Sequence, residues 1–350
     1  MQLEGLKMRR HGMLAFVFLL LPASLILHGF VPVGSASESF FSVVWLADTQ
    51  YLSEKYPGFF DATCRWIVDN RDAYNIQMVV HTGDIVNDGA NLAQWENANH
   101  SIGILLGSGV PYCWCAGNHD LLAGSWNGRK FAAFNVTVMR QKTYWEADLF
   151  DGKDTAVSFN FSGVSFLFVA VEFHANWTVL EWLSSLLKEH PDCYAVFATH
   201  DYLNESCGYD SWATDLRENV LANHSNVFMT LSGHYHNSGN ANRTKVGTRD
   251  ELFFDYQNLD SEKGGATMRI LTFNMSGSEV EVKTYKPYSE QFIVDADNQF
   301  TLSIPPEAIP EFSRVTLPLA LALLSVPCAL SAAKRLRSRK VATHACSRHW

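Results

Sequence analysis

Short apolar runs alternate with segments of helical spacing through the middle of the chain. Residues 40–47 are a run of apolar and β-branched residues, which predicts a buried strand, whereas residues 59–75 have apolar side chains at helical spacing. Ser162-Gly163 separates two strand-like runs, which indicates a hairpin. Parallel and antiparallel strands are therefore both expected in an α/β fold. The same patterns predict further strands at 78–81, 110–116, 155–161, 164–171, 194–198, 227–231, 252–256, 267–273 and 279–285, and helices at 92–106, 178–189 and 211–222.

The amino-terminal segment has a different pattern from the middle of the chain. Arg9 and Arg10 precede a long apolar run at 12–33, and the small residues 34–36 follow it. Basic residues, an apolar stretch and small residues in this order are typical of a secretory signal peptide. Residues 1–36 are therefore predicted to be a signal peptide, and an uncleaved anchor is the alternative.

The carboxyl-terminal segment also has the pattern of a membrane-associated element. Residues 315–333 carry no charge and are long enough to cross a bilayer, and a basic cluster follows them at 334–340. Four prolines precede this stretch and indicate a stalk. The predicted organisation is a signal peptide at 1–36, a folded domain at 37–286, a proline-containing stalk at 287–312, a transmembrane or sorting segment with its basic cluster at 313–340, and a short tail at 341–350.

Charge is distributed unevenly along the chain. The formal net charge is −9, but residues 1–36 carry +2 and residues 313–350 carry +7, which leaves −18 for residues 37–312. A body this acidic repels polyphosphate backbones, so a long nucleic acid is not an expected partner. A small phosphorylated substrate remains compatible with this charge if metal ions supply local positive charge.

Asparagine glycosylation signals support the export of the middle region. Eight Asn-x-Ser/Thr sequences lie within about 200 residues, a density that indicates an exported and glycosylated surface. With the basic cluster on the inner side, the folded domain is predicted to lie on the extracellular face of the membrane. The eight asparagines are Asn99, Asn135, Asn160, Asn176, Asn204, Asn223, Asn242 and Asn274.

The cysteines of the middle region give a weaker signal. Their number is odd, so at least one is unpaired or linked outside the domain. Cys113 and Cys115 lie two residues apart in one apolar run, where a direct bridge would be strained and zinc-finger spacing is missing. Buried free thiols are therefore expected for Cys64, Cys113, Cys115, Cys193 and Cys207.

Polar side chains follow five of the predicted strands at the point where each strand ends. Open sheets place ligand sites at such carboxyl ends, and a glycine lets the backbone turn sharply before the polar residue. Each short motif alone is common in ordinary turns, but five in order are not explained in that way. The motifs are Asp48-Thr49-Gln50, Gly83-Asp84, Gly117-Asn118-His119-Asp120, His200, and Gly233-His234-Tyr235-His236.

This pattern resembles the calcineurin-like metallophosphoesterase family over roughly residues 40–285. The family has Asp-x-His, Gly-Asp, Gly-Asn-His-Asp/Glu, a single His, and Gly-His-x-His, and the last four motifs match without change. Gln50 stands where the usual ligand is His, as in some branches of the family, and a neutral amide oxygen is a weaker donor than imidazole. The resemblance implies a four-layer α-β-β-α sandwich of two mixed sheets, with a dinuclear metal site at the carboxyl ends of the strands.

The resemblance also implies ligands and a mechanism. Two divalent ions would activate a bridging hydroxide for in-line attack on phosphorus, and Mn, Fe and Zn all suit mixed nitrogen and oxygen ligands. His119 would be the general acid for the leaving group, with Asp120 orienting its imidazole. The first ion would take Asp48, Gln50, Asp84 and His236, and the second would take Asp84, Asn118, His200 and His234.

The end of the chain resembles a second known pattern. Ile309-Pro310-Glu311-Phe312, the apolar span and the basic cluster are similar to a PEF-CTERM sorting tail, which archaeosortase-type enzymes process. In such tails the span is removed and the protein is attached to lipid. The additional residues 341–350 depart from the pattern, so a plain single-pass anchor is the alternative.

Two functions are therefore compatible with the sequence. The first is a surface-exposed, monomeric phosphoester hydrolase that acts on a small phosphorylated substrate and is held at the membrane by its carboxyl-terminal segment. The second is a non-catalytic cell-surface module that retains the scaffold, an alternative that Gln50 alone favours. No motif separates phosphomonoesters from phosphodiesters.

Overall fold

The strands form two mixed sheets. The computed structural model describes residues 39–124, 126–236, 241–259 and 266–306. The first sheet contains β1 (Phe40–Leu46), β2 (Ile76–His81), β3 (Tyr112–Trp114), β11 (Met268–Asn274), β12 (Glu279–Lys286), β13 (Gln291–Ile293) and β14 (Gln299–Ser303). The second contains β4 (Trp145–Leu149), β5 (Asp154–Phe161), β6 (Val164–Val171), β7 (Tyr194–Thr199), β8 (Val227–Ser232), β9 (Ala241–Val246) and β10 (Arg249–Phe254).

Parallel strands form one end of the first sheet and the centre of the second. The order is β13-β12-β11-β1-β2-β3 in the first sheet, with β14 beside β12, and β4-β5-β6-β7-β8-β10-β9 in the second. β1, β2 and β3 are parallel to one another, as are β6, β7, β8 and β10. The parallel strands of each sheet therefore present their carboxyl ends at one edge, where the polar motifs of the sequence lie.

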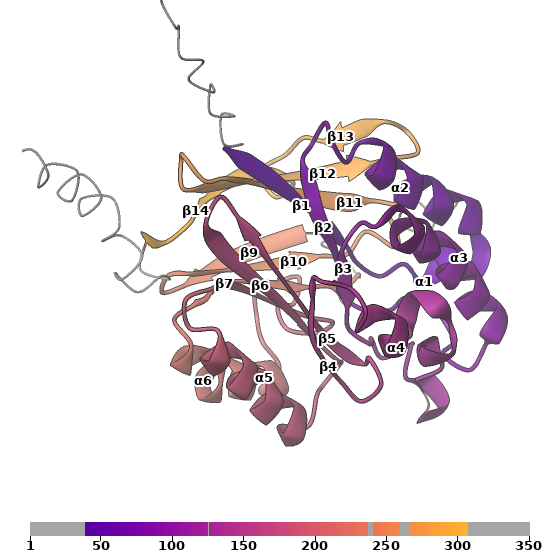
Figure 1. Cartoon of the computed structure of the whole chain (residues 1–350), viewed down its shortest axis with the longest axis horizontal. Helices are drawn as coiled ribbons and strands as arrows, with labels where there is room; N and C mark the ends of the chain where they lie inside the picture. The colour runs from indigo at the N-terminus through magenta and orange to yellow at the C-terminus, as the bar shows by residue number, and fades with distance from the viewer. Residues whose placement is uncertain (1–38, 125, 237–240, 260–265, 307–350) are drawn as a thin grey trace, which may run out of the picture. The chain divides into compact units, whose positions relative to one another are not determined.

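Helices cover the outer face of each sheet, and the inner faces pack against one another (Figure 1). Phe41 and Trp45 of β1 share one apolar core with Phe166 and Phe168 of β6, which places that core between the sheets. Separate cores join the first sheet to α1–α4 and the second to α5 and α6. The predicted four-layer α-β-β-α sandwich is thus confirmed. The helices are α1 (Gln50–Lys55), α2 (Pro57–Asp69), α3 (Leu92–Ser108), α4 (Val136–Met139), α5 (Trp177–Glu189) and α6 (Ser211–Asn219).

The proline-containing segment after β12 does not form a stalk in the part that the structure describes. β13 and β14 both pair with β12 in antiparallel register, and Leu302 and Ile304 are buried in the core between the sheets. The predicted domain boundary at residue 286 is therefore wrong, and the domain continues to at least residue 304. Pro287, Pro305 and Pro306 lie outside β13 and β14, so they do not interrupt the pairing.

Several predictions from the chain ends concern residues beyond the described ones. The predicted signal peptide at 1–36 and the predicted membrane or sorting segment at 313–340 both fall there. Within the described ranges, no helix combines the length and the apolar character needed to cross a membrane. All five cysteines of the middle region are free, as expected, and only Cys207 is partly exposed among them.

Candidate metal centre

The predicted ligands converge where the carboxyl ends of the two sheets meet. Asp48 follows β1 and Asp84 follows β2 in the first sheet, whereas His200 follows β7 in the second. Ligand atoms of these three buried side chains all lie within 4.8 Å of one another. The cluster therefore joins the two sheets and offers two carboxylates and an imidazole, which are ordinary ligands of divalent metals.

The backbone around these ligands is held in an unfavourable conformation. Asp48, Asp84 and His234 have φ angles of 54°, 52° and 78°, in the left-handed region that most residues avoid. Gly117 and Gly233 permit close packing, because a Cβ atom would overlap the Asp84 carboxylate at the first position and the Asp48 carboxylate at the second. Strain and close approach of this kind concentrate at functional sites.

The ligands predicted for the second ion surround His200. Its Nε2 lies 2.9 Å from Asn118 Oδ1, 3.1 Å from His234 Nδ1 and 3.3 Å from Asp84 Oδ2. Its Nδ1 lies 3.0 Å from the carbonyl oxygen of Thr82. That carbonyl accepts a proton on Nδ1, so the lone pair of Nε2 points into the cluster and is available to a metal.

The ligands predicted for the first ion include an unpaired amide oxygen. Gln50 Nε2 donates to Asp84 Oδ2 at 3.1 Å, but Gln50 Oε1 is buried without a hydrogen-bond partner among the described residues. An unsatisfied buried oxygen costs free energy unless a cation or donor approaches it. Asp48 accepts the backbone N–H of His234 at 3.1 Å, and His236 Nδ1 lies 3.1 Å from the His234 carbonyl oxygen. The residues present therefore fit two metal ions.

The electrostatics of the cluster favour added positive charge. Burial raises the pKa of Asp48 well above its ordinary value, and Asp255 raises it further. Burial also opposes ionisation of Asp84, but the neighbouring His200 imidazole lowers the pKa of Asp84 overall. Although burial disfavours its charge, His200 has a pKa raised to about 10 because Asp84 and Asp48 lie beside it. The carboxylates thus draw positive charge onto His200, and bound divalent ions would supply that positive charge in its place.

A family comparison extends this evidence beyond the geometry. Residues 41–238, more than half of the chain, match the family model described as calcineurin-like phosphoesterase. The chain belongs to the calcineurin-like phosphoesterase family. The match includes all five motifs, from Asp48 to His236. Membership supports hydrolysis of phosphoesters as the general activity, and the substrate is left open.

Individual proteins resemble this family member to different extents. It is 31% identical over 283 residues to the uncharacterized protein YvnB of Bacillus subtilis (strain 168), which corresponds to 77% of this chain and 22% of YvnB. The chain therefore spans less than a quarter of that relative's length. GAP50, the anchor in the inner membrane complex of Plasmodium, has a similar fold, with a TM-score of 0.50, 12% identity, and coverage of 79% of this chain and 92% of that one. The purple acid phosphatase PPD1 of yellow lupin (Lupinus luteus) seeds gives a TM-score of 0.48 with 17% identity, over 76% of this chain and 54% of PPD1.

The two predicted catalytic residues occupy different places in the candidate centre. His119 Nδ1 lies 2.7 Å from the carbonyl oxygen of Asn87, and its imidazole is partly exposed. Asp120 is fully buried, and its carboxylate accepts the backbone N–H groups of Val86, Ile85 and Gly117. The expected orientation of His119 by Asp120 is therefore wrong. Asn87 orients the ring through its main chain, and Asp120 holds two ligand loops together.

The sequence did not single out four further residues beside the site. His174 Nε2 lies 3.0 Å from Asp201 Oδ2 and 3.1 Å from Asp210 Oδ2, and Asp201 immediately follows the ligand His200. Asp255 Oδ2 lies 3.5 Å from His236 Nδ1. Asp255 was predicted to lie inside a strand at 252–256, but β10 ends at residue 254. A correct strand boundary would have added Asp255 to the list of polar residues at strand ends.

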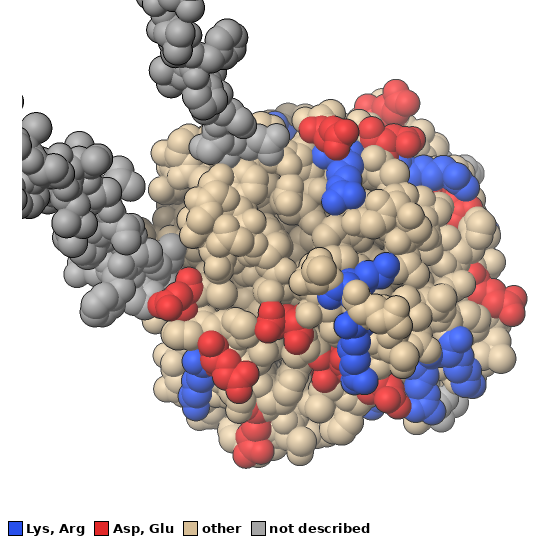
Figure 2. All heavy atoms as spheres, in the orientation of Figure 1, with Lys and Arg blue, Asp and Glu red and all other residues tan. Residues whose placement is uncertain are grey.

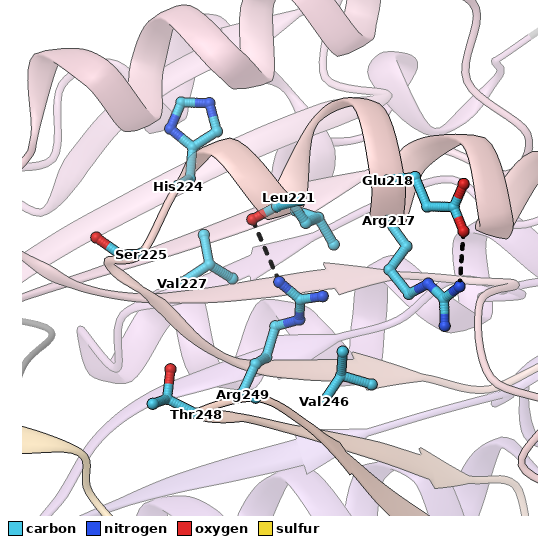
Figure 3. Close-up of a pocket in the computed structure, with 11 residues that line it drawn as sticks. Arg217, Glu218, Leu221, His224, Ser225, Val227, Val246, Thr248 and Arg249 are labelled. Carbon is cyan, nitrogen blue, oxygen red and sulfur yellow. Dashed lines mark hydrogen bonds and ion pairs between the residues drawn. The ribbon is translucent and has the colours of Figure 1, made fainter.

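A separate cavity of about 500 Å³ opens at the other edge of the second sheet (Figure 3). Val227 and Arg249, the first residues of β8 and β10, line it. It therefore lies at the amino ends of the strands whose carboxyl ends carry the metal ligands. Arg249 Nη1 donates to Leu221 O, and Arg217 Nη2 donates to Glu218 Oε1. Both arginines are thus already paired, and this cavity is distinct from the candidate centre.

Proposed function

We propose that this chain is a metal-dependent phosphoester hydrolase with two divalent ions. Asp48, Gln50, Asp84 and His236 would hold the first ion, and Asp84, Asn118, His200 and His234 would hold the second. The observation that carries the proposal is the linked ligand cluster, together with the buried Gln50 oxygen that has no hydrogen-bond partner among the described residues. The donor set suits Mn, Fe or Zn.

Asp84 is suited to be the shared ligand. Its Oδ2 lies 3.1 Å from Gln50 Nε2, on the side of the first ion, and 3.3 Å from His200 Nε2, on the side of the second. Its Oδ1 accepts the backbone N–H of His119 at 2.9 Å, which fixes the carboxylate. A shared anion between two dications offsets their mutual repulsion. When bound, the ions supply Lewis acidity to the phosphoryl oxygens and lower the pKa of a water molecule.

His119 is proposed to protonate the leaving-group oxygen. Its side chain is partly exposed, and its Nε2 lies 4.0 Å from Asp84 Oδ2. The Asn87 carbonyl accepts a proton on Nδ1 and orients the ring, so Nε2 is the atom that faces the site. A proton held there could pass to a departing alkoxide or phenoxide. Asp120 acts on the loop backbone and not on the proton.

The setting of the enzyme is part of the same proposal. We propose that the folded domain lies on the extracellular face of a membrane. This location is supported by the signal-like segment at 1–36, by the apolar segment at 313–340 with its basic cluster, and by the sequons. A small substrate is favoured over long nucleic acid, since residues 37–312 carry a net charge of −18. Figure 2 shows basic side chains interspersed with acidic ones on the face in view, without a basic tract. We also propose that the chain acts as a monomer.

The competing function is a non-catalytic surface module with the same scaffold. Only Gln50 favours it, and the buried, unpaired oxygen of Gln50 is better explained by an ion than by a redundant side chain. Metal content and turnover separate the two functions. The purified chain, stripped with chelator and reloaded with Mn, should hydrolyse p-nitrophenyl phosphate or bis(p-nitrophenyl) phosphate, and the preferred compound would distinguish a monoesterase from a diesterase.

Asp84→Asn is the sharpest variant for this test. It keeps the shape of the side chain and removes the shared negative charge, so bound Mn should fall below two equivalents and turnover should fall at least about 100-fold. Asp192→Asn, at an exposed carboxylate, is the matched control and should match the parent chain in both measurements. Normal metal content and turnover in Asp84→Asn would refute the ligand assignment. A parent chain with neither Mn nor turnover would favour the scaffold module.

A further inference from the structure

Asp255 is a fully buried carboxylate that lies outside the five sequence motifs. It directly follows β10, which pairs in parallel with β8 so that Phe253 lies opposite Ser232. His236 follows the same end of β8. The two neighbouring strand ends therefore bring Asp255 to the last ligand of the proposed first ion.

The contacts of His236 converge on one ring nitrogen. Its Nδ1 lies 3.5 Å from Asp255 Oδ2, 3.1 Å from the His234 carbonyl oxygen and 2.9 Å from Gln257 Nε2. Gln257 also holds Asp255: its backbone N–H donates to Oδ1 and its Nε2 donates to Oδ2, each at 2.9 Å. The other ring nitrogen, Nε2, is the one left to bind an ion.

These neighbours favour opposite tautomers of His236. A neutral imidazole that binds a metal through Nε2 carries its proton on Nδ1, and that proton needs an acceptor. Asp255 Oδ2 and the His234 carbonyl are acceptors, whereas Gln257 Nε2 is a donor and favours the proton on Nε2. Turning the Gln257 amide would not resolve the conflict, because its oxygen would then face Asp255 Oδ2. The anionic carboxylate is therefore the decisive group.

We propose that Asp255 is a positioning residue for the first metal ion. Its carboxylate keeps the proton of His236 on Nδ1, directs Nε2 to the ion and increases the donor strength of the ring. This compensates for Gln50, whose amide oxygen is a weaker donor than the usual imidazole. The inference rests on the proposed function, because it requires an ion at this position.

The total charge of the site agrees with this role. Asp48, Asp84 and Asp255 are 0%, 2% and 0% exposed, which makes three buried carboxylates close to one another. A divalent ion bound beside His236 would offset the mutual repulsion of these carboxylates, and Asp255 adds to the attraction for that ion.

The second ion should not depend on Asp255. Its ligand His200 is oriented by the neutral Thr82 carbonyl, 3.0 Å from Nδ1, and Asn118 and His234 complete the set. A change at residue 255 therefore affects one of two sites, whereas loss of folding would affect both.

Calorimetric titration of the chelator-stripped chain with Mn tests the proposal. The parent chain should bind two ions, and Asp255→Asn should weaken one of them by about 10- to 100-fold while the other is unchanged. Gln257→Leu removes the competing donor and should bind the first ion at least as tightly as the parent. Asp250→Asn, at a buried carboxylate of β10 that pairs with Lys245 of β9, is the control and should leave both affinities unchanged.

A double-mutant cycle with His236→Ala shows whether Asp255 acts through the imidazole. If it does, Asp255→Asn should have no further effect on the affinity of the first ion in the His236→Ala background. Full additivity of the two substitutions, equal weakening of both ions, or unchanged affinities in Asp255→Asn would each overturn the positioning role while the proposed function stands. A parent chain that binds no Mn would instead overturn the proposed function.

Discussion

His119 contributes two different groups to the site, and they have different consequences. Its backbone N–H donates to Asp84 Oδ1 at 2.9 Å and so fixes the shared ligand. Its imidazole is held by the carbonyl oxygen of Asn87, and its Nε2 lies 4.0 Å from Asp84 Oδ2. Removing the side chain therefore leaves the support of Asp84 in place.

We expect the His119→Ala variant to have a lower turnover rate but the same metal content as the parent chain. Loss of a positioned general acid costs about 10²- to 10⁴-fold in rate, and the loss should be smaller for substrates whose leaving group needs no proton. Turnover of an alkyl phosphate and of p-nitrophenyl phosphate, together with metal content, measures this difference. His100→Ala, at an exposed histidine on α3, is the control. Loss of metal in His119→Ala would show that the imidazole is structural.

At the residue scale the sequence predicted which side chains lie together but not what each one contacts. All seven proposed ligands are linked by contacts in the structure, since each follows a strand or glycine turn whose motif is local. The orientation of His119 depends on the main-chain carbonyl of Asn87, and main-chain directions are not encoded in a local pattern. Asp255 was missed because its importance depends on a strand boundary, and boundaries are the least certain part of such predictions.

At the scale of elements, the sequon asparagines have structural roles of their own. Asn176 caps α5, where its Oδ1 accepts the N–H groups of Thr178 and Val179, and Asn135 caps α4 in the same way. Asn204 and Asn160 accept backbone N–H groups in turns. Asparagine is favoured at such positions because its side chain replaces a missing backbone partner. Because these roles explain the presence of several of the asparagines, the density of sequons is weaker evidence for export than the sequence alone suggests.

Substitutions at Asn176 separate capping from glycosylation. Asn176→Ala removes the cap and should lower the free energy of unfolding by about 1 kcal/mol, whereas Asn176→Asp keeps an acceptor and should cost less. Thr178→Ala destroys the sequon but keeps the cap, so it should behave like the parent chain. Chemical denaturation of the unglycosylated chain measures all three. Equal stability of Asn176→Ala and Thr178→Ala would contradict the capping role.

The elements that sequence patterns missed are short or lie at sheet edges. β9 and β4 are edge strands, and β13 has only three residues, so each lacks the long apolar run of a central strand. β14 lies in the proline-containing segment that the sequence predicts to be a stalk, but its Leu302 is buried in the core. Central strands and the helices α3 and α5 were predicted within a few residues, because burial on a regular face imposes a clear period.

At the scale of the whole molecule, the site exists only because two sheets meet. Asp48 and His234 are 186 residues apart in the chain, and a backbone N–H of one donates to the carboxylate of the other. Neither motif specifies this contact. The contact results from packing the inner faces of both sheets into one core. The family resemblance, and not periodicity, supplied the prediction that the two halves share a metal centre.

The same packing also buries the carboxylate of Asp154. Asp154, at the start of β5, is completely buried; its Oδ1 accepts the Glu172 N–H at 2.8 Å, and its Oδ2 has no partner among the described residues. Burial raises the pKa of Asp154 to about 8. Because the ordinary value is 3.8, the folded chain retains this proton over a pH range in which the unfolded chain has lost it.

This difference in proton binding should make the folded state less stable as pH rises from about 4 to about 8. Between these values unfolding releases the Asp154 proton, so the contribution falls by at most about 1.4 kcal/mol per pH unit; above both pKa values it stays at its lower level. Asp154→Asn cannot ionise, so its free energy of unfolding relative to the parent should increase from pH 5 to pH 8. Denaturant titrations of both proteins with chelator present measure that difference, and contributions from the metal ligands cancel in it. A difference that does not change with pH would mean that Asp154 ionises in the folded chain as easily as in the unfolded one.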